Sequence, residues 1–309
     1  MDAQGLHVVV GAGGVTGRLV VSHLLAAGRR VRALTRDGRA VGSAGAELGA
    51  VDASDPVALT AATAGAVAIY HCAMPPIGRW LSDFPPLTDS IIEAASVTGA
   101  RLVYADDTWM YGRVSGPMTP DLPYRPVGRL GVLRAWLAER FSHAAAAGRI
   151  RLSIVRAGEL YGPQVRSMIA GTVFGNVRRG RTARWFGDPD LPITPTYVDD
   201  FARTVAAVGQ HDSGTNRVWH VPHPGPTTGR NLVALAAGQA GGRARVITTS
   251  RRQLQALGTV LPLARDGAEL IYQFEQPFIV DGSATTEAFG LTATPYAEGV
   301  RAVLASHSG

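Results

Sequence analysis

Three glycines spaced three residues apart follow the first apolar segment of the chain. They are Gly11, Gly14 and Gly17, in the run Gly-Ala-Gly-Gly-Val-Thr-Gly. Glycines at this spacing permit a tight turn, let the backbone approach a diphosphate, and let a helix pack closely on a strand. The free N–H groups at the helix start then bind phosphate. Such glycines also serve ordinary turns, but the strand and helix around them favour a dinucleotide site. The predicted site comprises Gly11, Gly13, Gly14, Val15, Thr16 and Gly17.

The end of the second apolar segment bears on which dinucleotide binds. Thr35, Arg36 and Asp37 stand there in succession. An acidic residue at this point holds the ribose 2′-hydroxyl of NAD, whereas arginine suits the 2′-phosphate of NADP. Because Arg36 follows the segment directly, we expect NADP(H) to be favoured over NAD(H), with Thr35 and Arg36 in the site. Because Asp37 is close by, binding of NAD(H) stays a possible alternative. Arg36 also has a structural alternative, which is an ordinary surface residue at a strand end.

The elements that must position these residues alternate between strand and helix patterns through the first half of the chain. This alternation predicts a parallel sheet covered on both faces, an α/β fold of the Rossmann-type doubly wound class. The predicted strands are 6–10, 30–35, 50–55 (with a turn), 67–71, 102–105, 151–155 and 217–221. The predicted helices are 15–27, 56–63, 91–98, 132–147 and 197–208.

The alternation of strand and helix patterns stops after Arg156, where glycine, proline and aromatic residues become frequent. We therefore predict a Rossmann domain over residues 1–156, completed by about 196–222. Residues 157–195 and 223–309 are expected to form a smaller C-terminal substrate-binding lobe.

Composition narrows the class of protein. The net charge is +6, and all 30 basic residues are arginines spread along the chain, with no aromatic-interleaved basic stripe. We therefore expect no nucleic-acid partner. Apolar runs are too short to span a membrane, and no secretory signal pattern precedes Leu6. A lone Cys72 excludes an internal disulfide and a cysteine-based zinc site. These features predict a cytoplasmic protein, and the arginine-rich composition is typical of a bacterial genome of high GC content.

Two further features of the sequence argue against a metal site and against a hydrolase. His220 and His223 flank Pro222, but no carboxylates at metal-ligand spacing accompany them, so packing at a strand end is the better interpretation and no metal is expected. No Gly-x-Ser-x-Gly motif is present, which argues against a hydrolase.

Several motifs in order along the chain resemble those of the extended short-chain dehydrogenase/reductases, the family of NAD-dependent epimerases and dehydratases. They are Val51–Asp55, His71–Met74, Tyr104–Gly112, Ile154–Pro163, Tyr197–Asp200, Phe289-Gly290 and Thr294-Pro295. The resemblance implies that Asp52 and Ala53 lie near the adenine, that Cys72, Ala73 and Met74 line the cofactor, and that Arg156 lies in the segment reaching the nicotinamide. It also implies a small-molecule substrate and a homodimer formed by helix pairs.

The departures from the family pattern concern proton transfer. The family carries a serine or threonine and a Tyr-x-x-x-Lys pair, in which tyrosine moves the proton and lysine lowers its pKa. This chain has no lysine, and its helix around 129–140 has no tyrosine. Asp107 occupies the serine position beside Thr108, and Arg134 can supply the cation for the ribose. The catalytic candidates are therefore Asp107, Thr108, Tyr111 and Arg134, with Tyr124 as a second phenol.

Each catalytic candidate has a structural alternative. Asp107 can be a turn or cap residue at a strand end, Tyr111 a packed aromatic, and Arg134 one member of a surface ion pair. Aromatic residues in the segments that the family uses near its substrate suggest an apolar or aromatic ligand face, although tryptophan is more often a core residue. The predicted substrate-binding residues are Trp80, Trp109, Tyr161, Trp185 and Tyr197.

These observations lead to three hypotheses of function. The first is an NADP(H)-dependent oxidoreductase acting on a carbonyl or alcohol of a small organic, possibly aromatic, molecule. The second is a non-redox isomerase, cyclase or dehydratase whose dinucleotide site is structural or vestigial, which the missing Tyr-Lys pair favours. The third is a non-enzymatic sensor of NADP(H). Fold alone does not decide among them.

Overall fold

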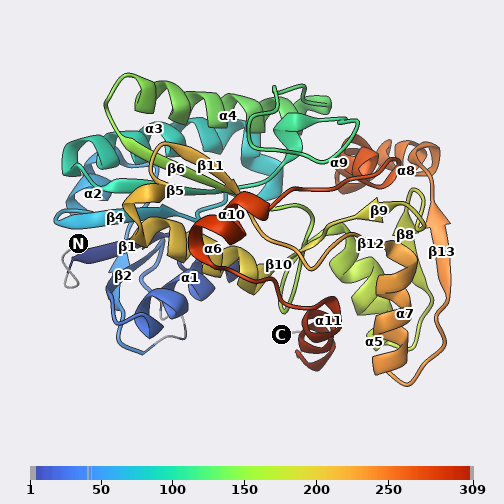
Figure 1. The fold of residues 1–309 in the computed structure, drawn as a ribbon. Helices are drawn as coiled ribbons and strands as arrows, with labels where there is room; N and C mark the ends of the chain where they lie inside the picture. Colours follow the sequence, from blue (N-terminus) through green and yellow to red (C-terminus); the bar gives the residue numbers. More distant parts are fainter. Residues whose placement is uncertain (1–4, 40–41, 43, 307–309) are drawn as a thin grey trace. The chain divides into compact units, whose positions relative to one another are not determined.

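Apolar β-branched residues form the first strand, β1 (Leu6–Val10), in which all five residues are buried. In the computed structural model, which describes residues 5–39, 42 and 44–306, β1 lies inside a seven-stranded sheet of order β11-β6-β5-β4-β1-β2-β3 (Figure 1). The pairings β1–β2, β1–β4, β2–β3, β4–β5 and β5–β6 are all parallel. The other strands are β2 (Arg30–Thr35), β3 (Glu47–Ala50), β4 (Ala66–His71), β5 (Arg101–Asp106), β6 (Arg151–Arg156) and β11 (Arg217–His220).

The strand order reverses beside β1, as in doubly wound dinucleotide-binding sheets. The carboxyl ends of parallel strands therefore share one edge of the sheet. The Rossmann-type fold class predicted from the sequence is confirmed. Five helices accompany this sheet: α1 (Val15–Ala26), α2 (Pro56–Ala62), α3 (Trp80–Thr98), α4 (Gly128–Ala146) and α6 (Val198–Gln210).

Local chemistry fixes several of these helix ends. Asp55 begins α2 by accepting hydrogen bonds from the N–H groups of Val57 and Ala58, with Pro56 at the first helical position. Helix α3 ends at Gly99, which has φ +66°. This helix begins at Trp80 rather than at Ile91, because Pro85 and Pro86 inside it hide its first half from a sequence-based prediction.

The chain packs as two units, each assembled from three segments. Unit 1 comprises Met1–Asp106, Trp136–Arg156 and Phe201–Trp219. Unit 2 comprises Asp107–Ala135, Ala157–Asp200 and His220–Gly309. Residues 107–135, which the sequence analysis assigned to the N-terminal domain, thus pack with unit 2. The assignment of cofactor binding to one region and substrate binding to the other stays a prediction.

Unit 2 contains short strands in pairs. β7 pairs with β10 and β8 with β13 in parallel, whereas β9 pairs with β12 in antiparallel fashion. The strands are β7 (Leu160–Tyr161), β8 (Ala183–Phe186), β9 (Pro192–Ile193), β10 (Thr196–Tyr197), β12 (Thr227–Thr228) and β13 (Val246–Thr249). The helical elements are η2 (Trp109–Tyr111), η3 (Ala170–Gly175), α5 (Asn176–Arg178), α7 (Gly229–Gln239), α8 (Arg251–Gly258), α9 (Pro262–Leu270), η5 (Ile271–Phe274), α10 (Ser283–Phe289) and α11 (Tyr296–Ala305).

Helix length and polarity bear on membrane insertion. Within residues 5–39, 42 and 44–306, none of the helices combines the length and the apolar character that a membrane crossing needs.

Candidate functional site

The glycine turn of unit 1 connects β1 to α1 through a backbone conformation that requires glycine. Gly11 has φ +84°, and its N–H donates to Leu34 O at 3.1 Å. A Cβ on Gly11 would lie 2.4 Å from the backbone of Ala73, and one on Gly17 would lie 2.3 Å from Gly11 O. Larger residues therefore cannot replace Gly11 or Gly17 without displacing backbone, which is the close approach predicted from their spacing.

The start of α1 leaves backbone donors open. Gly14 is the N-cap residue and has no side chain to accept from the first N–H groups of the helix. Gly13 and Gly14 are exposed, and a Cβ on Gly13 would meet only Thr35 Cγ2, at 3.5 Å. An uncapped helix start beside two exposed glycines, at the positive end of the helix, fits the diphosphate of a dinucleotide. Val15 and Thr16 contribute the next two N–H groups of this first turn.

The end of β2 lies beside this turn. Thr35 is buried, whereas Arg36 and Asp37 are exposed. The Asp37 carboxylate accepts from Thr35 Oγ1 at 3.4 Å and from Arg39 Nε at 2.8 Å, and hydrogen bonding from Arg39 lowers its pKa. An ionised carboxylate at this strand end is the group that holds a ribose hydroxyl in NAD sites.

Asp52 follows β3 at the same sheet edge. Its Oδ1 accepts from Ser54 Oγ at 2.6 Å and from the Ser54 N–H at 3.0 Å, and Ala53 beside it is half-buried. These bonds from Ser54, and then the charge of Arg36, lower the pKa of Asp52. Part of the Arg36 charge is therefore directed at an acidic side chain of the protein itself.

The segment after β4 reaches the glycine turn. The Cys72 N–H donates to Val10 O at 2.9 Å, and Ala73 packs against Gly11. Cys72 is half-buried, and burial raises the pKa of its thiol to about 12, so it stays protonated. Met74 is 62% exposed. The structure thus gathers the predicted residues of strands β1, β2, β3 and β4 at one edge of unit 1.

Arg156 is predicted to lie in the cofactor site. It is fully buried, and its Nε lies 3.3 Å from Asp106 Oδ2, whose side chain is also fully buried. The two residues face each other across the β5–β6 pairing. A guanidinium with no accessible surface gives the cofactor assignment no support, and that assignment stays a prediction.

Asp107 and Arg134 form the charged centre of unit 2. Asp107 Oδ2 lies 2.8 Å from Arg134 Nε, and the Arg134 side chain is only 3% exposed. Asp107 Oδ1 accepts the Trp109 N–H at 2.9 Å. The Arg134 guanidinium also lies over the Trp109 ring, 5.8 Å from its centroid. Two of the catalytic candidates are therefore in direct contact. Asp107 also accepts a backbone hydrogen bond two residues further on, as expected if it is instead a turn or cap residue.

Thr108 and Tyr111 lie in the same segment but face different surroundings. Thr108 is fully buried, and its hydroxyl has no hydrogen-bond partner among residues 5–39, 42 and 44–306. Tyr111 is buried, with its hydroxyl 2.8 Å from His220 Nε2, and its ring meets Tyr124 edge-on at 5.9 Å. His220 Nδ1 lies 3.2 Å from Met118 O, so Nδ1 donates and Nε2 accepts the Tyr111 proton. Tyr111 thus has the packed surroundings of its structural alternative.

Three of the predicted substrate aromatics are core residues. Trp80 is 6% exposed and donates from Nε1 to Pro75 O at 2.8 Å in unit 1. In unit 2, Tyr161 and Trp185 are at most 1% exposed, and Trp185 packs edge-on against Phe274 at 5.2 Å. Large aromatic surfaces stabilise a protein most when fully buried, so these three side chains do not form the predicted ligand face. Trp109 and Tyr197 are half-buried.

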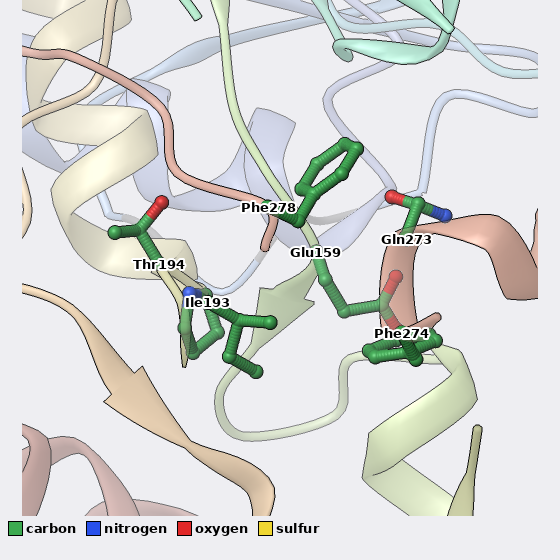
Figure 2. A pocket seen from close by; sticks show the side chains of 7 residues that line it. Glu159, Ile193, Thr194, Gln273, Phe274 and Phe278 are labelled. Atoms are coloured by element: carbon green, nitrogen blue, oxygen red, sulfur yellow. The ribbon is translucent and has the colours of Figure 1, made fainter. Parts of the chain in front are cut away.

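Sequence analysis missed a polar pair in unit 2. Glu159 and Gln273 line one small cavity, together with Phe274 and Phe278 (Figure 2). Glu159 stands in a stretch of small and apolar residues between β6 and β7, and this interruption by an acid is the signal that could have identified it. Gln273 lies in the short helix η5 and carried no signal.

The described residues do not form a recognisable metal site. No cluster of three or more histidine, cysteine, aspartate or glutamate side chains there is arranged to hold an ion. The ring nitrogens of His220 contact Tyr111 and Met118 instead.

A doubly wound sheet with a glycine cradle at its switch point defines a dinucleotide-binding α/β protein. The model of the NAD dependent epimerase/dehydratase family matches residues 7–221. The chain belongs to this enzyme family, as the motifs in the sequence suggested. No curated protein matches the sequence.

Solved structures share the fold at low identity. MoeE5 in complex with UDP-glucose and NAD is 22% identical, with 97% of each chain covered and a TM-score of 0.76. UDP-glucuronic acid 4-epimerase from Bacillus cereus in complex with NAD is 17% identical, with 96% of each chain covered and a TM-score of 0.76. The UDP-glucose 4-epimerase of Thermus thermophilus in complex with NAD is 18% identical, with 97% of each chain covered and a TM-score of 0.77.

The preference for NADP(H) over NAD(H) predicted from Arg36 was wrong. The family is NAD dependent, and the solved structures described above carry NAD. The physical reason lies in the surroundings of Arg36, whose charge acts on Asp52, while the Asp37 carboxylate stands at the same strand end. A single arginine beside two carboxylates is weak evidence for a 2′-phosphate site. The cofactor of the proposal below is therefore NAD.

Proposed function

We propose that this protein binds NAD on the glycine turn of unit 1 and is an oxidoreductase or epimerase acting on a hydroxyl group of a sugar nucleotide. The observation that carries the proposal is the start of α1 inside the glycine turn, which no side chain caps. A side chain on Gly11 or Gly17, at either end of this turn, would collide with backbone. The substrate class follows from the UDP-sugar ligands of structural neighbours.

Each part of NAD has candidate contacts in unit 1. The N–H groups of Val15 and Thr16 at the start of α1 would hold the diphosphate, Asp37 would accept from a ribose hydroxyl, and Asp52 would lie toward the adenine. When bound, NAD supplies hydride-transfer chemistry to the reaction. The protein supplies the position of the substrate and a group that takes or gives the hydroxyl proton.

In unit 2, Asp107, which the sequence predicts at the family's serine position, pairs with Arg134, which can supply a cation for the ribose. A carboxylate held by a guanidinium accepts a hydrogen bond from a substrate hydroxyl, and Thr108, buried without a partner among the described residues, is a second hydroxyl beside it. Arginine keeps its charge throughout and moves no proton. Asp107 is therefore proposed to orient the reacting hydroxyl.

A non-redox reaction on the same fold is the second candidate. It is favoured by the ion pair of Asp107 with Arg134 and by the absence of tyrosine from the sequence of α4, which together remove the usual phenol acid. In that case NAD would be a structural group or would not bind.

The experiment that tests NAD binding is a fluorescence titration with NADH. We expect saturable binding by the wild-type protein and at least a tenfold weaker affinity for Gly14→Asp, because the carboxylate repels the diphosphate and occupies its N–H donors. Gly238→Asp is the matched control, since Gly238 lies on α7 with open space around it and should bind as the wild type does. No affinity for NADH or NAD⁺ in the wild type would refute the proposal.

The reaction class is tested with UDP-glucose and UDP-glucuronic acid as probes. Formation of the 4-epimer without lasting NADH absorbance indicates an epimerase, and stoichiometric NADH formation indicates a dehydrogenase. NADH binding with no change in either probe contradicts the substrate class and leaves the sensor hypothesis as the better one.

A further inference from the structure

Two arginine-rich segments of unit 2, distant in the sequence, lie side by side in the fold. Residues 176–187 and 238–252 each contain four arginines, and neither segment contains aspartate or glutamate. Strand β8 lies in the first segment and β13 in the second, and the two strands pair in parallel (Figure 1). The pairing therefore joins two stretches of like charge into one basic surface.

The arginines on and beside these strands face solvent. Arg181, Arg184, Arg243 and Arg245 are all exposed. Arg184 Nη1 donates to Thr249 Oγ1 at 2.8 Å, so this guanidinium lies over the end of β13. Exposed guanidinium groups gathered in this way attract an anionic partner.

Two carboxylates outside these segments bind other arginines. Asp190 Oδ1 lies 2.7 Å from Arg230 Nε, and Glu275 Oε2 lies 2.6 Å from Arg251 Nη2. These two acids are therefore already matched with one cation each, and the excess positive charge of the basic surface stays open to a partner.

The backbone of β13 has an open edge. β8 and β13 form a two-stranded sheet in the described part of the chain. The N–H groups of Ala183 and Gly187 donate to the carbonyl oxygens of Arg245 and Thr249, each at 3.0 Å. Because alternate residues of a parallel strand bond toward the same neighbour, Val246 and Thr248 direct their N–H and C=O groups to the opposite edge. Thr248 is exposed and Val246 half-buried.

The solvent face of this pair combines charge with one apolar side chain. Arg184 is in register with Ile247, which is 45% exposed, and Arg245 lies two residues before it on the same face. Trp185 points to the other face and is 1% exposed, so its ring is not available to stack on a nucleic-acid base. Open backbone groups beside arginines favour a peptide chain instead.

We propose that the open edge of β13 binds an extended acidic segment of a partner protein as a third strand. The backbone of this segment would pair with Val246 and Thr248. Its acidic side chains would face Arg184 and Arg245, with their stems on Ile247. A second copy of β13 does not fit, because it would bring the same arginines against one another. The proposal goes beyond the proposed function and does not require NAD binding.

The charge contribution is tested by fluorescence anisotropy of a short labelled peptide of alternating glutamate and valine, mixed with the full-length protein. We expect saturable binding that weakens as salt is added. Arg184→Gln/Arg245→Gln should bind the peptide with about tenfold weaker affinity. The matched control Arg149→Gln/Arg301→Gln removes two exposed arginines elsewhere and should bind as the wild type does.

The strand pairing is tested separately. Thr248→Pro removes an N–H from the open edge but no bond to β8, so we expect the affinity for the peptide to fall by about tenfold. Hydrogen exchange of the wild-type protein gives a second measurement that does not depend on the folding of this variant. The amides of Val246 and Thr248 should exchange freely without the peptide and become protected when it is bound.

Several outcomes overturn the proposal. Absence of saturable peptide binding refutes it directly. Equal affinity for a peptide with proline in place of valine, or no protection of Val246 and Thr248, shows attraction of charge without an added strand. Tighter binding of oligouridylate, or of vesicles containing phosphatidylserine, assigns the basic surface to nucleic acid or to a membrane instead.

Discussion

Asp107 divides its two carboxylate oxygens between two kinds of partner. Oδ1 accepts a backbone N–H from Trp109, and Oδ2 lies against the Arg134 guanidinium. A serine at this position could make the first contact but could not neutralise a guanidinium that is 3% exposed. Asp107 and Arg134 therefore depend on each other, because removal of the carboxylate would leave the buried guanidinium without its compensating charge.

A double-mutant cycle on this pair gives a prediction at the scale of the residue. Asp107→Asn keeps an acceptor for the Trp109 N–H but leaves Arg134 buried without its carboxylate, so we expect the free energy of unfolding to fall by ~2 kcal/mol. Adding Arg134→Met should recover most of this loss, because the uncompensated charge is gone. Urea unfolding of the four proteins measures both effects. Additive losses would mean that the two side chains are not coupled.

Helix α1 and strand β1 meet through the glycines of the turn that is proposed to bind the diphosphate. A Cβ on Gly17 would lie 2.3 Å from Gly11 O, whereas one on Gly14 would meet only Gly11 O at 3.5 Å. We expect Gly17→Ala to lower the free energy of unfolding by about 2 kcal/mol or more, since the helix must move away from the strand. Gly14→Ala should change it by only about 0.5 kcal/mol. Thermal unfolding of both variants distinguishes them, and equal losses would contradict the packing role of Gly17.

Most elements of unit 1 could be predicted from the sequence because their signals are local. Apolar β-branched runs indicated β1 and β2, and Asp55-Pro56 indicated the start of α2. The first half of α3 could not be predicted, because prolines that usually end helices lie inside it. The glycine cradle was likewise local, whereas the partners of Arg156 and Trp185 depend on contacts between distant segments that no spacing reveals.

The same limit applies to the catalytic candidates. The sequence identified Asp107 and Arg134 but did not reveal that they touch. It also did not reveal that Glu159 and Gln273 line one cavity. Burial decides what these groups do, and burial is a property of the folded chain. The catalytic roles of Asp107, Thr108, Tyr111 and Arg134 and the homodimer stay predictions.

His7 in unit 1 and Glu159 in unit 2 make contributions to stability that change with pH in opposite directions. In unit 1, burial and then the charges of Arg29 and Arg101 lower the pKa of His7 from 6.5 to about 4. The folded state therefore binds fewer protons than the unfolded state in this range, and stability is lost as pH falls from 6.5 to about 4. In unit 2, the pKa of Glu159 rises from 4.5 to about 7. Its contribution is full below pH 4.5 and is lost as pH rises to about 7.

A set of melting curves between pH 4 and pH 8 tests this expectation for the whole molecule. His7→Gln should lose less stability than the wild type on acidification below pH 6.5, and Glu159→Gln should lose less on going from pH 4.5 to pH 7. Each variant should leave the other arm of the pH profile unchanged. Parallel profiles for all three proteins would show that neither group is linked to folding.

The chain passes between the two units five times, at 106/107, 135/136, 156/157, 200/201 and 219/220. Two of these passages lie inside the continuous helices α4 and α6, where no exposed linker is available to a protease. Neither unit can be excised as one contiguous fragment, and exchange of unit 2 with that of a relative would require five simultaneous joints. Unit 2 is therefore more readily altered by point substitutions than by exchange of one contiguous cassette.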